Sequence, residues 1–475
     1  MFSNQFKPKC FTIFLLLSIT NFLPINSDSK KSCRIIIRDQ LAHPHNTRAD
    51  QQISELKELS SCEILKLSSF QNPDSAKRPN YWTYTTVLNK LSEMAPDWTL
   101  FIEPHTILNA HNLKSILELS NNSENAENDE NAEILHPTIY TNELIDEHLS
   151  IIHHFAGYKP EESHKKSFID FARGFLVNKI MLEKLSEYQS TIPQNPQSFH
   201  IDAAHELSEF IDKALESNGN GARKWLKHSE VFKNINVKTF LDYNCGSSHV
   251  TEDDFLVAVK TAKHLHKDRL KIVLETWGLE FKNIKFFSNV SQSLFNGKIE
   301  TTNTYNVPNT LKGHCGKTSA VIKNFDNKKY KFLVIVDDDT IFGKENLMKI
   351  LNCYEETDGI FIGERYGFAL GNKYSGYNYI TGGGGMILSS RGVEIYKDKC
   401  ECPSIESPDD MMISECLERN GVHMVHEPAF HQARPEDYTN GYLNAHGAVS
   451  FHKHWNCDPI SIYQEWFSKA KHDEL

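Results

Sequence analysis

The sequence predicts an α/β protein built from two tandem copies of one module. In its second half, apolar runs typical of buried strands alternate with helical stretches, which favours a mostly parallel sheet covered on both faces. In addition, a strand-turn-helix pattern in residues 98–117 recurs in residues 332–351. The 475 residues are enough for two ordinary domains, each with a core of its own.

The predicted strands of the second half are short apolar runs. We expect strands at residues 254–259, 271–274, 284–287 and 332–336, with a basic, histidine-rich helical stretch between the first two. Ligands of such sheets bind at the carboxyl ends of the strands, so polar residues that follow these runs are candidates for function.

The internal repeat extends over several pieces in the same order, which favours duplication over chance similarity. The aligned positions are Thr106 with Thr340, Asn112 with Asn346, Leu113 with Leu347, and residues 174–177 with residues 385–388.

Two polar segments interrupt the first half. Residues 121–133 have no apolar periodicity and read as a solvated loop, and residues 218–221 are a cluster of turn formers. We place the domain boundary shortly after this cluster, near residue 235.

The two ends of the chain resemble targeting signals. Lys7 and Lys9 precede an apolar run at residues 11–23, which predicts a signal peptide in residues 1–27. An uncleaved type II membrane anchor is the alternative, although the run is short for a bilayer span of about 20 residues. Residues 472–475, His-Asp-Glu-Leu, match the retrieval signal of the endoplasmic reticulum (ER). We therefore expect a protein of the ER lumen with a retrieval receptor as partner, and membrane contact only if the first segment is uncleaved.

Composition and cysteine content agree with a secreted globular protein. Hydrophobic residues make up 39% and charged residues 24%, and the formal net charge of −11 argues against a nucleic-acid partner. Ten cysteines in an oxidising compartment predict disulfides. Cys33 and Cys62 are the only cysteines between the predicted signal and the domain boundary, so we expect them to pair. Nine cysteines follow the signal, and an odd number leaves at least one thiol free or paired between chains.

An acidic triplet follows the last predicted strand directly. Asp337, Asp338 and Asp339 would repel one another at the end of a buried strand unless a cation is present. Carboxylate oxygens suit Mn²⁺ or Mg²⁺, and such an ion can in turn hold a diphosphate. A solvated acidic turn is the alternative interpretation, and the five preceding apolar residues make it the weaker one.

Three later motifs could complete a site. Residues 382–385 are four glycines, which either allow close approach of backbone to a ligand or form a mobile turn. Asp409 and Asp410 begin a helical stretch, where a carboxylate is either a cap or a general base. His452 and His454 offer imidazoles that the acidic triplet lacks.

Together these motifs resemble the Fringe-related β-1,3-glycosyltransferases. The resemblance covers residues 254 to about 466 and implies a GT-A (nucleotide-diphospho-sugar transferase) fold and inverting chemistry. The motifs are, in order, Thr276-Trp277, His314 to Thr318, Val336 to Thr340, Gly363 to Gly367, Gly382 to Met386, Pro408 to Asp410, Phe430 to Pro435, and Ser450 to Trp455.

The resemblance also implies roles for individual residues. The metal ligands are Asp339 and His452, the nucleotide-facing residues are Asp337 and Asp338, the diphosphate contact is Lys317, and the catalytic base is Asp410 with Asp409 as second choice. The chain departs from many relatives at Ser414, where they have glycine, so the backbone near the base is expected to differ.

The activity implied by the resemblance is transfer of glucose from UDP-glucose to the 3-hydroxyl of O-linked fucose on thrombospondin type 1 repeats, with Mn²⁺ or Mg²⁺ as cofactor. A galactosyl- or N-acetylglucosaminyl-transferase of the same family is one alternative. A catalytically inert glycan- or client-binding protein of ER quality control is the alternative from a different class.

The two predicted modules are expected to differ in function. Residues 236–471 would form the catalytic Fringe-like GT-A domain, and residues 28–235 a degenerate GT-A-like module that recognises the acceptor. In the repeat alignment the acidic triplet is replaced by Glu103, Pro104 and His105, and Ala203 and Ala204 stand opposite Asp409 and Asp410.

Overall fold

The computed structural model contains one compact unit, Ser32–Leu475, and the predicted terminal signals (residues 1–27 and 472–475) lie outside its described residues. We call residues 33–237 the first half and residues 250–468 the second half. The described residues are 33–70, 84–93, 95–124, 136–146, 166–191, 203–215, 223–243, 245, 250–303, 306–310, 312–368, 377–454 and 456–468.

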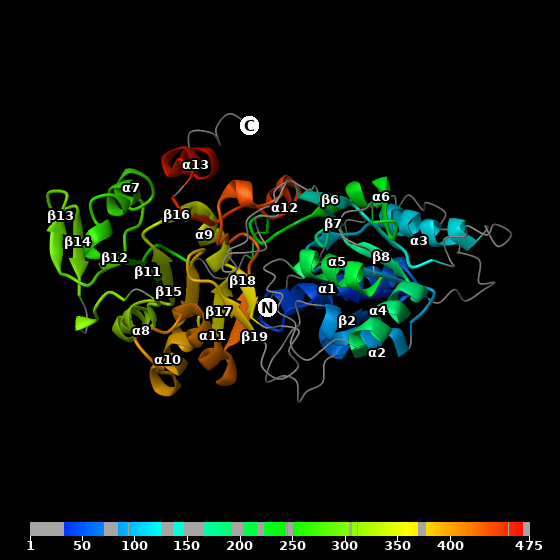
Figure 1. Ribbon diagram of the computed structural model, residues 1–475, viewed down its shortest axis with the longest axis horizontal. Helices are drawn as coiled ribbons and strands as arrows, with labels where there is room; N and C mark the ends of the chain where they lie inside the picture. The colour runs from blue at the N-terminus through cyan, green and yellow to red at the C-terminus, as the bar shows by residue number, and fades with distance from the viewer. Residues whose placement is uncertain are drawn as a thin grey trace, which may run out of the picture. The chain divides into compact units, whose positions relative to one another are not determined.

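The second half is organised around an eight-stranded mixed sheet (Figure 1). Its order is β13 (Gln292–Leu294), β14 (Ile299–Thr302), β12 (Ile284–Phe287), β11 (Phe255–Lys260), β15 (Phe332–Asp337), β20 (Met386–Ser389), β17 (Ile360–Gly363) and β21 (His423–His426). The strands around β11 are parallel, whereas β20 runs antiparallel to both of its neighbours. The apolar runs of β11 and β15 are central because helices bury both of their faces.

Alternate side chains of the central strands enter two separate cores, as the two-residue period of a strand requires. One core contains Val257 and Val334, and the other contains Leu256 and Leu333. The helices on the first face are α7 (Arg269–Glu275), α9 (Lys344–Leu351) and α13 (Pro459–Trp466). The helices on the second face are α8 (Cys315–Asn324), α10 (Ser390–Lys399) and α11 (Asp409–Arg419), and Figure 1 shows the two sets on opposite sides of the sheet.

The strand predicted at residues 271–274 is wrong, because these residues lie in helix α7. Leu270, Val273 and Trp277 are buried at helical spacing, whereas Lys271 is exposed. A four-residue apolar run fits a strand and a helix equally well, and one-sided burial decides for the helix. The preceding histidine-rich stretch contains only a short 3₁₀ turn, η6 (Lys263–Leu265).

The first half contains a six-stranded sheet with the same pattern. Its order is β2 (Glu63–Lys66), β1 (Cys33–Ile37), β3 (Trp98–Ile102), β8 (Phe175–Asn178), β5 (Ile139–Thr141) and β9 (Leu226–His228). These strands correspond one by one, in order and in pair direction, to β12, β11, β15, β20, β17 and β21. Helices α1 (His45–Leu59) and α3 (Ala110–Glu124) pack on one face, and α2 (Leu88–Glu93), α4 (Lys179–Thr191) and α5 (Ala203–Ala214) on the other.

Each half also has a two-stranded ribbon beside its central strand. In the first half β4 (Thr106–Ile107) pairs with β10 (Asn236–Val237), and in the second half β16 (Thr340–Phe342) pairs with β22 (Ser450–His452). Thr106 lies opposite Val237, and Thr340 lies opposite His452. The ribbons therefore place Val237 where the second half has its predicted metal-binding histidine.

The two halves contact each other through half-buried and buried polar groups. The side chain of Gln40 donates to the carbonyl oxygen of His426 and accepts from its amide, each at 2.9 Å. The His45 Nε2 atom lies 2.9 Å from the Tyr354 hydroxyl. A cavity of ≈ 70 Å³ lies between the halves, lined by residues of both.

Four disulfides join the described segments, and the predicted Cys33–Cys62 pair is confirmed. The others are Cys245–Cys353, Cys315–Cys402 and Cys400–Cys416. Cys457 is the free cysteine of the described part of the chain, as the odd count requires.

Candidate active site

The acidic triplet lies at the carboxyl end of β15, in the turn before β16. Five buried apolar residues hold the strand in the core, so the turn is fixed at the sheet edge. The Thr340 hydroxyl accepts from the Asp337 amide at 3.1 Å and donates to the Gly383 carbonyl oxygen at 2.8 Å. The turn is therefore fastened to the glycine cluster of residues 382–385.

Pairing of β16 with β22 brings His452 to this turn. Its Nε2 atom lies 3.2 Å from an oxygen of Asp339, and its Nδ1 lies 3.1 Å from the Gln432 carbonyl oxygen. Because a carbonyl only accepts, Nδ1 carries the proton in this contact and Nε2 faces the carboxylates. Burial alone would lower the pKa of His452, but the Asp339 charge outweighs it and raises that pKa.

One carboxylate oxygen each from Asp337 and Asp339 and one nitrogen from His452 lie within 4.8 Å of one another. Two hard oxygens and an imidazole whose far nitrogen is held by a carbonyl are a donor set that fits Mn²⁺. The residues present therefore fit the predicted metal, with Asp337 joining Asp339 and His452 as a third candidate ligand.

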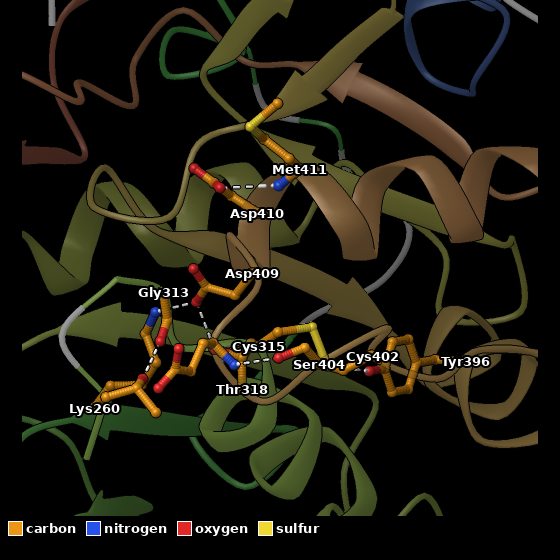
Figure 2. Close-up of a disulfide and its surroundings, with 12 residues drawn as sticks. Lys260, Gly313, Cys315, Thr318, Tyr396, Cys402, Ser404, Asp409, Asp410 and Met411 are labelled. Carbon is orange, nitrogen blue, oxygen red and sulfur yellow. Dashed lines mark hydrogen bonds and ion pairs between the residues drawn. A yellow bond between two sulfur atoms is a disulfide. The ribbon is translucent and has the colours of Figure 1, made fainter. Parts of the chain in front are cut away.

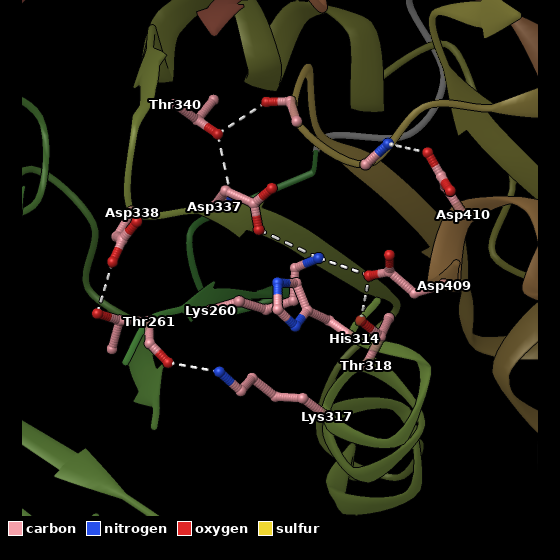
Figure 3. Close-up of polar contacts among 12 residues, drawn as sticks. Lys260, Thr261, His314, Lys317, Thr318, Asp337, Asp338, Thr340, Asp409 and Asp410 are labelled. Carbon is pink, nitrogen blue, oxygen red and sulfur yellow. Dashed lines mark hydrogen bonds and ion pairs between the residues drawn. The ribbon is translucent and has the colours of Figure 1, made fainter. Parts of the chain in front are cut away.

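Asp338 turns away from this group of donors. It accepts from the Thr261 hydroxyl at 2.6 Å and from Arg269 at 2.8 Å, and the same guanidinium lies 3.1 Å from Asp339 (Figure 3 shows the Thr261 contact). Burial and the neighbouring Asp339 raise the pKa of Asp338 to about 6. Burial also opposes ionisation of Asp339, but His452 and Arg269 outweigh it, so the pKa of Asp339 lies below its usual range. Arg269 thus supplies cationic charge beside the triplet.

A buried lysine links the triplet to the start of α11. Lys260 is the last residue of β11, level with Asp337 on β15. Its ammonium lies 3.1 Å from Asp337 and 2.7 Å from Asp409, and the side chain is 5% exposed (Figure 3). The Thr318 hydroxyl donates to the same Asp409 oxygen at 2.5 Å. Burial would raise the pKa of Asp409, but Lys260 outweighs it and lowers that pKa to about 2.

The adjacent carboxylate has different surroundings. Asp410 accepts from its neighbour, the Met411 amide, at 2.9 Å and from the Gly382 amide at 3.4 Å. Burial and the charge of Asp409 raise the pKa of Asp410 to about 7. A proton acceptor near neutrality fits a general base better than a carboxylate fixed by an ammonium ion, so the structure favours Asp410 over Asp409 for this role.

Disulfides fix the segment that leads to these two carboxylates. Cys315–Cys402 joins the first residue of α8 to the loop before α11, beside Thr318 and Asp409 (Figure 2). The Cys315 amide also donates to the Ser407 carbonyl at 3.1 Å. Helix α8 and the start of α11 are therefore held together covalently and through backbone contacts.

The acidic triplet, His452 and the predicted diphosphate contact Lys317 all line one cavity of ≈ 420 Å³. The Lys317 ammonium donates to the Thr261 carbonyl at 2.7 Å and to Asn309 at 3.0 Å, and burial lowers its pKa. Asp409 and Asp410 are not among the lining residues, and Asp409 connects to the cavity through Lys260. The volume of this cavity lies in the range of about 300–1,000 Å³ that is typical of small-molecule sites.

Sequence reasoning missed two residues of this site, Lys260 and Arg269, and it named Thr318 within a motif without giving it a role. Lys260 had a signal, because it is the charged residue that ends an otherwise apolar strand. Arg269 stood in a stretch with several basic residues, so it was not distinguishable without the packing.

The mixed α/β fold and the acidic site define the class of protein. Residues 250–473 match the family described as Fringe-like. The chain is 32% identical over 468 residues to the human protein named "Beta-1,3-glucosyltransferase", with 94% of this chain and 87% of the relative covered. The mouse protein of that name is 34% identical, with 84% and 78% covered. A zebrafish (Danio rerio) "Beta-1,3-N-acetylglucosaminyltransferase manic fringe" is 27% identical, with 50% and 70% covered.

These are the signatures of a glycosyltransferase. The chain belongs to the Fringe-related β-1,3-glycosyltransferase family.

Proposed function

We propose that this chain transfers glucose from UDP-glucose to the 3-hydroxyl of O-linked fucose on thrombospondin type 1 repeats, in a metal-dependent reaction that inverts the anomeric centre. The observation that carries the chemistry is the pairing of two sites. A donor set of two carboxylates and one imidazole lines the cavity, and a carboxylate whose pKa is near neutral begins the adjacent helix.

The residues divide the work between leaving group and nucleophile. Asp337, Asp339 and His452 would hold Mn²⁺ or Mg²⁺, which when bound neutralises charge on the departing diphosphate. Lys317 and Arg269 line the same cavity and add cationic charge to it. Asp410 takes the proton from the fucose 3-hydroxyl as that oxygen attacks the anomeric carbon and UDP departs. One displacement of this kind converts an α-linked donor into a β-linked product.

The choice of glucose and of the fucosylated acceptor rests on similarity. The relatives that cover most of the chain are named for β-1,3-glucosyl transfer, whereas the Fringe relatives named for N-acetylglucosaminyl transfer match over half of it or less.

A donor panel on the purified full-length chain tests this proposal. UDP-glucose, UDP-galactose and UDP-N-acetylglucosamine are each offered with Mn²⁺ and a thrombospondin repeat, fucosylated or unfucosylated, and with EDTA as the metal-free arm. We expect glucose transfer to the fucosylated repeat in the arm with Mn²⁺ and no transfer in the arm with EDTA. Transfer of another sugar would replace the donor, and binding of the repeat without turnover of any donor would favour the inert quality-control protein.

We further propose that both halves are GT-A-like modules and that the first is degenerate. Matching strand order and pair directions support the duplication. Equivalent hydrogen bonds extend it to α5 and α11, because the Ser208 hydroxyl accepts from the Ile169 amide at 3.3 Å, as the Ser414 hydroxyl accepts from the Ile380 amide at 3.0 Å. That register sets Ala203 and Ala204 opposite Asp409 and Asp410, so the first half lacks both carboxylates.

We also propose that the first half recognises the folded acceptor. Glu103 and His105 lie at the sheet position where the first half would hold a sugar donor. They line the cavity shared with the second half, together with Glu364 and His446. The acceptor would therefore be contacted by other surfaces of the first half. Binding of a folded thrombospondin repeat to the full-length chain, mapped by hydrogen exchange, tests this: protection confined to the second half would contradict it.

The four disulfides support an oxidising compartment such as the ER lumen. Among the described residues we find no helix with the length and apolar character needed to cross a bilayer. Immunolocalisation with and without residues 472–475 tests the retrieval prediction, and an unchanged distribution would contradict it.

A further inference from the structure

The glycine cluster joins three parts of the candidate active site. Residues 382–385 run between β19 (Tyr377–Ile380) and β20. The Gly382 amide faces Asp410, and the Gly383 carbonyl accepts from the hydroxyl of Thr340, which also holds the acidic turn. The Gly384 amide donates to the side chain of Gln432 at 2.8 Å. The cluster is thus anchored on both sides rather than open to a ligand.

Gly383 lies directly against the ring of His452. A Cβ atom built on Gly383 would be 2.6 Å from Nε2 and closer still to two other ring atoms. Such approaches are far inside van der Waals contact, so the ring would have to move. Its room to move is small, because Nδ1 is held by the Gln432 carbonyl and the His452 amide donates to the Ala433 carbonyl at 3.1 Å.

The neighbouring glycine does not have this constraint. A Cβ on Gly382 would meet Asp410, Lys260 and Met386 only at 3.9–4.0 Å, which is ordinary contact. The structure gives Gly382 no positive φ, so alanine is compatible with its backbone as well. The close approach to the histidine belongs to Gly383 rather than to its neighbour.

The first half contains an internal comparison. Thr106 donates its hydroxyl to the Ala172 carbonyl at 2.8 Å, as Thr340 does to the Gly383 carbonyl, so Ala172 takes the place of Gly383. Val237 lies opposite Thr106 where His452 lies opposite Thr340. Where the imidazole is absent, the glycine is absent too.

We propose that Gly383 is a positioning residue whose missing side chain lets the His452 imidazole stand at the metal-binding turn. The inference rests on the metal-dependent function proposed above. It assigns the glycine cluster to placement of protein groups rather than to close approach of a ligand. A methyl group on Gly383 would displace the ring and so disturb the contact of Nε2 with Asp339, which now measures 3.2 Å.

The test uses the full-length chain with Gly383→Ala and the matched control Gly382→Ala. Titration calorimetry with MnCl₂ measures metal affinity without turnover. We expect Gly383→Ala to weaken Mn²⁺ binding by about tenfold or more, the scale seen when groups that orient a ligand are disturbed. Gly382→Ala should bind Mn²⁺ within about twofold of wild type, since its Cβ meets no ligand. Equal affinity of Gly383→Ala and wild type would overturn the inference.

A second measurement separates this inference from the proposed function. Gly383→Ala should lower the thermal midpoint, and adding His452→Ala should recover part of the loss because the colliding ring is gone. If wild type binds no Mn²⁺, the metal-dependent function fails, and this recovery alone decides whether Gly383 positions His452. If Gly383→Ala does not accumulate as folded protein, recovery of folded double variant supports the inference. Absence of recovery in either case overturns it.

Discussion

The carboxylates and the imidazole at the cavity can each be removed by a single substitution that leaves the surrounding packing largely in place. Asp339→Asn or His452→Ala should abolish Mn²⁺-dependent turnover of the donor while the protein still folds, because each change deletes one ligand. Activity measured against Mn²⁺ concentration, with a circular dichroism spectrum of each variant, checks this. Near-wild-type activity at limiting Mn²⁺ would show that the residue concerned is not a ligand.

The two adjacent aspartates are separated by their surroundings. Asp410→Asn should retain UDP binding and lose transfer by at least about a hundredfold, the scale of general base catalysis. Inactivity of Asp409→Asn by itself would be uninformative, because it also leaves Lys260 without its closest partner. Retained transfer by Asp410→Asn with loss in Asp409→Asn would move the base to Asp409.

The pH dependence of transfer follows from the raised pKa of Asp410. The base must be ionised to accept a proton, so kcat should rise with pH, with a slope near one, and level off above about 7. The Asp409 carboxylate, with a pKa of about 2, is ionised throughout this range and would give no such limb. The measurement needs saturating Mn²⁺, because protonation of His452 also opposes metal binding in acid. A flat profile between pH 5 and 8 would exclude Asp410 as the base.

At the scale of elements, the Cys33–Cys62 disulfide ties the beginning of β1 to the residue before β2. Closing a loop of 29 residues stabilises a fold by about 3–4 kcal/mol in the chain-entropy treatment. The double variant Cys33→Ser/Cys62→Ser should therefore have a lower thermal midpoint than wild type. Metal affinity in the second half should be unchanged. A fall in both the thermal midpoint and the metal affinity would show that the disulfide supports more than the first sheet.

Sequence patterns predicted correctly the elements whose residues favour one type of secondary structure over the other. The five apolar residues before the acidic triplet, three of them β-branched, favour a buried strand, and β15 is one. The run at residues 271–274 allows two structures, and only the burial of Leu270 and Trp277 beside it selects the helix. In the same way, the sequence offered the acidic triplet and His452 as separate motifs. Their meeting depends on the pairing of β16 with β22 across more than a hundred residues, which no local pattern contains.

The whole molecule depends on how its halves meet. The amide and carbonyl of His426 both bond to the side chain of Gln40, so Gln40→Ala should leave these half-buried backbone groups of β21 without two hydrogen bonds. Hydrogen exchange should become faster at the His426 amide, and the thermal midpoint should fall. Gln51→Ala, on an exposed position of α1, is the matched control. Unchanged exchange at His426 in Gln40→Ala would show that the contact contributes little in solution.

The small cavity between the halves limits how many donor molecules one chain can hold. Its volume of ≈ 70 Å³ compares with ≈ 420 Å³ at the acidic triplet, and residues of both halves line it. Aspartates placed at residues 103–105 and 203–204 would add charge at this cavity without enlarging it. Each polypeptide should therefore bind its nucleotide-sugar donor with a stoichiometry of one.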